Sequence, residues 1–526
     1  MQCFGTLRLS IQLRRRWRRM RLIVRVHWWR WKMRFVIRMY RTRSQWQRQV
    51  RVIVRVRRRW RQMWLVVRMH RTIAMTHTLP ANIQRFERNG KIILINPEVP
   101  AWIVTNPTGE LITTLFDGIN SDAEVVDIAT EGLGEQFRQQ VSQFVSHIIA
   151  SNIFSTKPIG QPHRQLLSMV HLSLSNHCNL RCRYCYAAQR HESSGKPLTF
   201  DEYCSLIDNL RAINPEVGFT ITGGEPLLSP IVLDIARKIK ERGNYAMLLT
   251  NGTLLSNTLC LQLKGLIDQV TISVDATTPQ KHALTRGDNL NAVERAIAML
   301  DSHNIPCSIS MTVTSLNIDE VEPMARKYGA RLSFAPLFPV SDQANSLAIT
   351  GDQYYNALKA AAGVNPLAYC ETSLDAAMKS PYLKCAIAEG EISIAPNGDV
   401  YPCQLLHNPE FLCGNIRSTP IAQIYADSAA AKRCRALTVD NLDKCNRCAI
   451  KYICGGACRA RSFYESGDIT NVGPFCSYEL NAYLDGMVRI YSANAIAQHT
   501  ATPHNDCNTI DWSVTSDTEN KSEKIP

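Results

Sequence analysis

Residues 169–185 read MVHLSLSNHCNLRCRYC, and this stretch decides the fold. Met169–Leu174 is a short apolar run of strand length, and three cysteines follow it closely. Similar strand candidates recur downstream, separated by helical patterns such as Phe200–Ile213 and Asn291–Ser302. They lie at Gly218–Thr222, Ala246–Thr250, Val270–Val274, Ser308–Val313 and Arg331–Phe334. Repeated strand–helix units predict a parallel sheet, open or closed as a barrel, with its chemistry at the carboxyl ends of the strands.

The three cysteines, Cys178, Cys182 and Cys185, predict a small inorganic cluster. Four thiolates would complete a [4Fe–4S] cube, whereas three leave one iron without a protein ligand. An open iron can bind and activate a small molecule, much as an open position marks a catalytic zinc site. The alternative is a structural zinc site in which His177 serves as the fourth ligand.

The C-x3-C-x2-C spacing, with Tyr184 before the last cysteine, resembles the radical S-adenosylmethionine (SAM) superfamily. Gly223-Gly224-Glu225-Pro226, after the second strand, resembles the GGEP motif of that family. The resemblance implies an α/β fold with a partial (β/α)6 barrel and a [4Fe–4S] cluster that binds SAM. It also implies reductive cleavage of SAM and hydrogen abstraction from a substrate. The residues implied to contact SAM are Tyr184, Gly223, Gly224, Glu225, Ser273 and Asp275.

Some residues near these motifs can be interpreted either as SAM contacts or as ordinary structural residues. Tyr184 either packs near the adenine or is an ordinary core residue. Arg286 can pair with the SAM carboxylate, although a solvated loop arginine is the preferred interpretation. Asn251 follows the third strand. No catalytic acid or base can be assigned from the sequence.

A second set of cysteines occupies the carboxyl-terminal third. Cys385 precedes Gly398 and Cys403, and Cys445-x2-Cys448-x5-Cys454-x3-Cys458 is followed by Cys476. This spacing resembles the SPASM extension of radical SAM peptide maturases such as pyrroloquinoline quinone (PQQ) synthesis protein E. The alternative is a pair of zinc-ribbon-like structural sites.

The resemblance implies two auxiliary [4Fe–4S] clusters. One is held by Cys445, Cys448, Cys454 and Cys476, and the other by Cys385, Cys403 and Cys458. The fourth ligand of the second of these clusters stays open. Cys370 is a tentative candidate, Cys413 and Cys434 are alternatives, and an open iron that binds substrate is a further one.

Residues 76–160 predict a small domain of short strands followed by three helices. Strands are expected at Lys91–Ile95 and Trp102–Thr105, and helices after Asn106-Pro107 and after the capping box Ser121–Glu124. An apolar stripe from Val141 to Ile149 predicts the third helix. The pattern resembles the winged-helix-like domain of PQQ-synthesis protein D, which implies binding of a leader peptide as an added strand. A purely structural accessory domain is the alternative.

The first 75 residues differ from the rest in composition. They contain 23 of the 60 Lys and Arg and none of the 45 Asp and Glu, so the remaining chain is mildly acidic. This argues against a nucleic-acid-binding enzyme despite the net charge of +15. The segment could bind an anionic lipid or nucleic acid or act as a transit-like peptide. The preferred interpretation is a low-complexity, unstructured extension ahead of Met75.

The predicted organisation is therefore an extension (1–75), a leader-peptide domain (76–160), a radical SAM core (166–370), a SPASM domain (371–490) and a disordered tail (491–526). We expect a cytoplasmic enzyme, because we find no secretory signal and no membrane span. Together the resemblances imply a maturase that installs a crosslink or related modification in a ribosomally made peptide. They also imply a flavodoxin- or ferredoxin-type electron donor. The alternatives are a haem-precursor or sulfatase-maturing enzyme, and a non-catalytic iron–sulfur protein.

Overall fold

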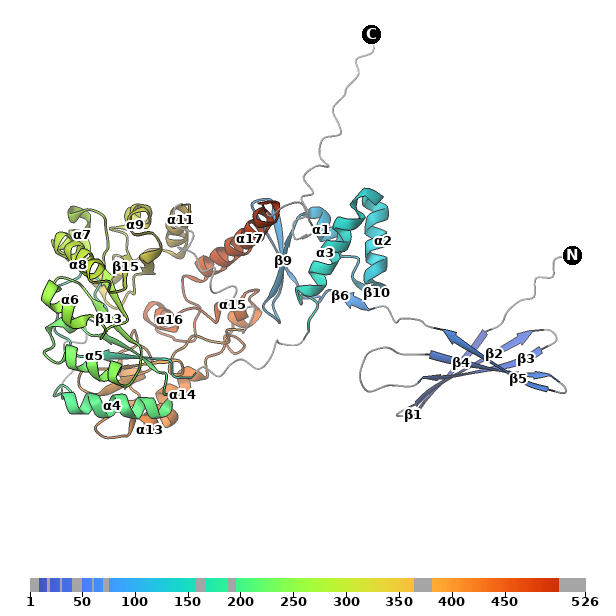
Figure 1. The fold of residues 1–526 in the computed structure, drawn as a ribbon, viewed down its shortest axis with the longest axis horizontal. Coiled ribbons are helices and arrows are strands. Elements are labelled where there is room, and N and C mark those ends of the chain that lie inside the picture. Colours follow the sequence, from blue (N-terminus) through green and yellow to red (C-terminus); the bar gives the residue numbers. More distant parts are fainter. Residues whose placement is uncertain are drawn as a thin grey trace, which may run out of the picture. The chain divides into compact units, whose positions relative to one another are not determined.

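The computed structural model describes residues 75–156, 166–187, 195–363 and 381–500, with side chains as far as residue 492 (Figure 1). It also describes the backbone of five strands between residues 9 and 69. The chain divides into two compact units. One comprises Met1–Thr78 and Thr114–Arg138, and the other Leu79–Thr113 and Gln139–Pro526.

The Arg/Trp-rich segment forms an antiparallel sheet in chain order, whereas the sequence analysis expects no structure there. Its strands are β1 (Leu9–Arg16), β2 (Arg19–Trp28), β3 (Trp31–Met39), β4 (Val50–Arg58) and β5 (Arg61–Met69). The physical reason is the alternation of arginine with apolar residues, as in VRVIVRVRR of β4, which has the two-residue period of a strand. That the segment is dispensable stays a prediction.

The same unit contains a two-stranded ribbon and a capped helix. Strands β6 (Thr76–Thr78) and β10 (Asp117–Ser121) pair antiparallel, and α2 (Asp122–Leu133) follows. Ser121 and Glu124 form the expected capping box. The Nδ1 of His77 lies 2.8 Å from an Asp122 carboxylate oxygen.

In the second unit, a three-stranded antiparallel sheet precedes the barrel. It consists of β7 (Gln84–Arg88), β8 (Lys91–Asn96) and β9 (Ala101–Thr105), with helices α1 (Pro107–Thr113) and α3 (Arg138–Ala150) after it. The predicted strands are confirmed, and β7 was missed because its alternating residues are mostly charged or polar. Side chains of β8 and β9 share one apolar core with α17, the last helix in the described part of the chain.

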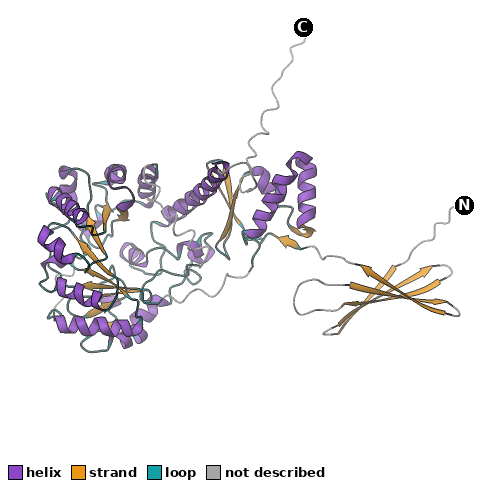
Figure 2. Ribbon diagram, in the orientation of Figure 1, coloured by secondary structure: helices purple, strands orange, loops and turns teal. Residues whose placement is uncertain are grey.

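Six parallel strands form the core of the second unit, as the sequence predicts. They are β11 (Met169–Ser173), β12 (Gly218–Thr222), β13 (Ala246–Thr250), β14 (Gln269–Ser273), β15 (Cys307–Val313) and β16 (Leu332–Pro336), and they neighbour one another in chain order. Figure 2 shows the helices on the outside of this sheet. They are α4 (Phe200–Ile213), α5 (Val232–Glu241), α6 (Asn257–Leu263), α7 (Pro279–Arg286), α8 (Leu290–Ser302), α9 (Val321–Tyr328) and α11 (Gly351–Ala362). The short helix α10 (Asp342–Asn345) follows β16, and its residue Ala344 packs in a cluster with Tyr184.

The two faces of this sheet differ in chemistry. Alternate residues such as Val170, Leu172 and Phe219 belong to the main apolar core, whereas His171 and Thr220 alternate with them. None of the six parallel strands contains lysine or arginine. The face opposite the core therefore carries several polar side chains and no lysine or arginine from the six strands.

The carboxyl-terminal third extends the sheet. Strand β17 (Glu391–Ile394) pairs parallel with β11, and β18 (Asp399–Tyr401) and β19 (Gly414–Asn415) continue antiparallel. Helices α13 (Ile421–Asp427), α14 (Ala429–Arg435), α15 (Lys451–Cys454), α16 (Arg459–Ser466) and α17 (Cys476–Thr500) complete the domain. The backbone of α17 continues past residue 491, where the sequence analysis places the start of a disordered tail. No helix among the described residues is long and apolar enough to cross a membrane.

Candidate cofactor and metal centres

The loop that carries the first three cysteines is braced by the loop that follows β12. The Gly224 N–H donates to the Ser175 carbonyl (2.7 Å), and the Glu225 N–H donates to the His177 carbonyl (2.8 Å). A Cβ added to Gly223 or Gly224 would lie 2.3 Å from a carbonyl oxygen of the cysteine loop. The two glycines therefore allow the close approach of two backbones, and this is what they do in the structure.

The Glu225 carboxylate is fully buried and is held between strands β12 and β13. It accepts hydrogen bonds from the Thr250 hydroxyl (2.8 Å), the Asn251 N–H (2.8 Å) and the Leu227 N–H (3.0 Å). Burial raises its pKa, and these hydrogen bonds oppose that shift. The structure thus shows a bracing role for Glu225, while its contact with SAM stays a prediction.

Asn251 connects this brace to the first cysteine. Its Nδ2 donates to Asn179 Oδ1 (2.9 Å) and lies 3.8 Å from Cys178 Sγ. The Leu180 N–H also points to Cys178 Sγ, at 3.4 Å. Donors of this kind stabilise a thiolate and tune any cluster that it holds.

The end of β14 carries a buried ion pair. Asp275 is fully buried, and its carboxylate lies 3.0 Å from Nε of Arg286. It also accepts a hydrogen bond from the Tyr184 hydroxyl and one from the Thr312 N–H (3.0 Å). Ser273, at the end of the same strand, is half-buried.

Arg286 is not the solvated loop residue that the sequence analysis prefers. Its side chain is 11% exposed, stands over the Tyr184 ring and reaches Cys182 Sγ at 3.9 Å. Burial opposes its charge, but the Asp275 carboxylate holds its pKa above the ordinary value. The sequence does not show that Arg286 pairs with Asp275, because the two residues are eleven positions apart and only the folded chain brings them together.

The cysteines fall into groups that influence one another. Burial raises the pKa of Cys178 and of Cys182, and the charge of Cys185 raises both further. In the carboxyl-terminal third, the charge of Cys458 raises the pKa of Cys385 and of Cys403, in addition to the effect of burial. Cys448 forms a separate group with the other three cysteines of its predicted set, Cys445, Cys454 and Cys476.

Each of these influences connects cysteines of the same predicted set, and the assignment of the sets to clusters stays a prediction. Among the described residues, no group of three or more His, Cys, Asp or Glu side chains is arranged so that it could hold a metal ion. Cys370 lies outside the described residues. Burial raises the pKa of the Cys434 thiol to about 12, and the charge of Cys413 adds to this shift. Cys413 and Cys434 are therefore neighbours.

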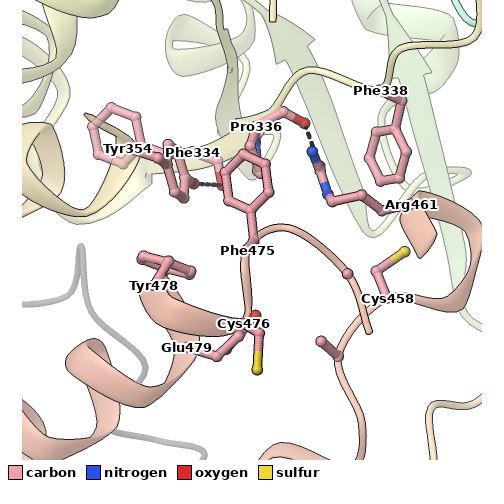
Figure 3. Close-up of a pocket in the computed structure, with 12 residues that line it drawn as sticks. Phe334, Pro336, Phe338, Tyr354, Cys458, Arg461, Phe475, Cys476, Tyr478 and Glu479 are labelled. Atoms are coloured by element: carbon pink, nitrogen blue, oxygen red, sulfur yellow. Dashed lines mark hydrogen bonds between the residues drawn. The ribbon is translucent and has the colours of Figure 1, made fainter. Parts of the chain in front are cut away.

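A cavity of about 240 Å³ lies between the barrel and the two auxiliary cysteine groups (Figure 3). Cys458 and Cys476 line it, together with aromatic side chains from β16, α11 and α17. Arg461 crosses its wall and donates to the carbonyls of Pro336 (2.8 Å) and Leu337 (2.7 Å). Burial raises the pKa of Glu479, also in the wall, to about 7.

Comparisons with known proteins agree with this geometry. Residues 172–328 match the radical SAM superfamily, and residues 385–449 match SPASM, an iron–sulfur cluster-binding domain. An AdoMet-dependent heme synthase of Methanosarcina barkeri is 26% identical over 334 residues, which cover 57% of this chain and 93% of that protein. A structure of anSMEcpe with bound AdoMet has a TM-score of 0.53 at 20% identity, covering 62% of this chain and 99% of that one. Another structure of anSMEcpe contains the peptide Cp18Cys as well.

The structure and these matches together establish the fold and the cofactor class. The fold is a radical SAM α/β fold with a cysteine-rich SPASM domain. The radical SAM domain binds a [4Fe–4S] cluster and SAM, and the SPASM domain binds further iron–sulfur clusters.

Proposed function

We propose that this chain, a radical SAM enzyme with a SPASM domain, modifies a ribosomally made precursor peptide. When bound, the cluster and SAM supply a one-electron cleavage whose product abstracts hydrogen from the substrate. The protein's own residues hold these groups, orient the substrate and exclude water.

Cys178, Cys182 and Cys185 are the proposed ligands of the SAM-binding cluster. Their mutual effects on pKa and the donors from Asn251 and Arg286 support this assignment. The proposed auxiliary sets are Cys385, Cys403 and Cys458, and Cys445, Cys448, Cys454 and Cys476.

For SAM itself, the proposed contacts are the residues at the carboxyl ends of β11, β12 and β14. Tyr184, Gly223, Gly224, Glu225, Ser273 and Asp275 all lie there. The buried pair of Asp275 and Arg286 supports a positioning role, because it ties the end of β14 to the cysteine loop.

The proposal of a peptide substrate is supported mainly by the three-stranded sheet β7–β8–β9. Its outer strands β7 and β9 pair with no further strand in the described part of the chain, and an extended peptide can add to such an edge through backbone hydrogen bonds. Ile93 and Ile95 pack with Ile450, Leu484 and other residues next to the auxiliary cysteines. A peptide held at this sheet would therefore be anchored to the domain that carries the clusters.

A second candidate function is haem-precursor modification, which the heme synthase relatives favour. Two observations speak for the peptide instead. The match to the M. barkeri protein takes in 93% of that protein but only 57% of this chain, so the chain contains much that the relative lacks. A tetrapyrrole with several carboxylates is bound best by several cations. The six parallel strands carry no lysine or arginine, and Arg461 in the cavity wall is already engaged by the Pro336 and Leu337 carbonyls.

The discriminating experiment uses the full chain, reconstituted anaerobically with iron and sulfide and given SAM and dithionite. Short peptides encoded beside the gene are one set of substrates, and a tetrapyrrole haem precursor is the other. We expect 5′-deoxyadenosine and loss of two hydrogens from a peptide by mass spectrometry. Conversion of the tetrapyrrole, with every peptide unchanged, would establish the second function in its place.

The same assay identifies the electron donor. Replacing dithionite by a flavodoxin or a ferredoxin with its reductase should support turnover, as proposed for this partner. A donor that reduces the protein without product formation would count against that partner.

A further inference from the structure

Asp485 is a buried carboxylate at which three elements of the second unit meet. It lies on α17, and its Oδ2 accepts a hydrogen bond from the Tyr355 hydroxyl of α11. Arg88, the last residue of β7, has its Nε 3.8 Å from Asp485 Oδ1. Lys359 of α11 has its Nζ 4.0 Å from Asp485 Oδ2. One strand and two helices therefore bring two cations to a single carboxylate.

The two cations are only partly engaged within the protein. Arg88 donates from Nη2 to Asn481 Oδ1, whereas its buried Nε has no hydrogen-bond partner in the described part of the chain. Lys359 Nζ lies 3.5 Å from the Tyr355 hydroxyl. Among the described residues, Asp485 is the one acidic side chain that pairs with either cation. The junction therefore has an unbalanced positive charge and unused N–H donors, as a site for an anion requires.

Both cations can be reached from solvent. The side chains of Lys359 and Arg88 are 54% and 32% exposed, whereas that of Asp485 is 11% exposed. An anion on a bound partner would therefore meet the ammonium and guanidinium groups at the surface, while Asp485 holds them from the inside.

Arg88 connects this junction to the sheet that is proposed to bind the peptide. It ends β7, whose outer edge pairs with no further strand in the described part of the chain. Phe86 lies on the same face of β7 and packs into the core shared with α17. A peptide added along β7 would therefore pass the two cations where the strand ends.

We propose that Arg88 and Lys359 bind a carboxylate side chain, Asp or Glu, of the precursor peptide. One charged contact at the end of β7 fixes the register of the added strand, because a slip along the edge would separate the charges. This inference rests on the proposed function. Residues 501–526 are a second source of carboxylates, with five Asp and Glu against two Lys, but the continuity of the site with β7 favours the peptide.

The test is fluorescence anisotropy of fluorescein-labelled peptides, encoded beside the gene, with the reconstituted full chain. Each peptide is paired with a copy in which every Asp and Glu is replaced by Asn or Gln. We expect Lys359→Gln to weaken binding of the native peptide about fivefold at low salt, with Arg88→Gln acting in the same direction. Neither variant should weaken binding of the neutral copy further. Lys432→Gln is the matched control, because Lys432 is 57% exposed and pairs with Asp427, and it should match the parent.

A reciprocal change keeps the test independent of folding. Lys359→Glu should bind best to a peptide in which one acidic residue is replaced by Lys, and circular dichroism should show the parent fold. Parent-like affinity in both neutral variants, or an equal loss with the native and the neutral peptide, would overturn the proposal. Tighter peptide binding by a chain that ends at Thr500 would assign the cations to residues 501–526 and overturn it as well. Failure of the parent to bind any peptide would instead refute the proposed function itself.

Discussion

Neutralising Asp275 tests the electrostatic design of the SAM site. Asp275 is fully buried and Arg286 nearly so, with 3.0 Å between carboxylate oxygen and Nε. Asp275→Asn keeps the shape and an oxygen for the Thr312 N–H, but it leaves the guanidinium without its counter-charge. Removing one partner of a buried ion pair lowers the free energy of unfolding by about 3–5 kcal/mol. Because the hydrogen bond from the Thr312 N–H is retained, we expect a loss of about 3 kcal/mol.

The control is the pair of Asp234 and Arg237 on α5, whose side chains are 49% and 51% exposed. Solvent screens this pair, so Asp234→Asn should cost less than about 1 kcal/mol. In addition, Arg286→Met in the Asp275→Asn background should recover most of the loss, because no buried charge then remains unpaired.

The assay is urea unfolding of the metal-free, reduced full chain under anaerobic conditions, compared at equal m-value. If Asp275→Asn and Asp234→Asn differ by less than about 1 kcal/mol, or if the double variant is no more stable than Asp275→Asn, then the buried charge pair does not govern the stability of this site.

Three further outcomes are expected. Gly224→Ala places a Cβ 2.3 Å from the His177 carbonyl oxygen, so it should lower the free energy of unfolding by about 2 kcal/mol and reduce the iron content. The control is Gly132→Ala on α2, where the added Cβ meets nothing within 4 Å. It should leave the free energy of unfolding unchanged or raise it in the same urea assay. Arg461→Met leaves the buried Leu337 carbonyl and the partly buried Pro336 carbonyl without their donors, and it should lower the free energy of unfolding by about 2–3 kcal/mol in thermal melting. A loss below about 0.5 kcal/mol would contradict that reasoning. A chain starting at Met75 should retain full SAM cleavage, and loss of folding in circular dichroism would refute the dispensable extension.

The sequence predicted the barrel well because its strands obey local rules. Each parallel strand is a short, largely apolar run, and β12 and β13 begin and end at the predicted residues. A capping box likewise located α2, and the structure shows a second one, formed by Thr199 and Glu202, at the start of the predicted helix α4.

The missed features depend on contacts between distant residues. Strands β17–β19 are only two to four residues long, and the pairing of β17 with β11 spans more than two hundred residues of sequence. The partners of Glu225 lie at the end of the next strand, and those of Arg286 on β14 and in the cysteine loop. Motif spacing identifies such residues, but it does not show which of their atoms are already satisfied by the protein.

The core shared by β8, β9 and α17 has a consequence for the synthesis of the chain. Ile93 and Ile95 emerge from the ribosome early, yet their apolar partners Leu484 and Met487 are among the last described residues to be translated. Part of the apolar surface of the small sheet therefore stays exposed until α17 has been translated, almost four hundred residues later. Nascent chains that stop short of α17 should attract chaperones through this sheet, and the completed helix would end that exposure.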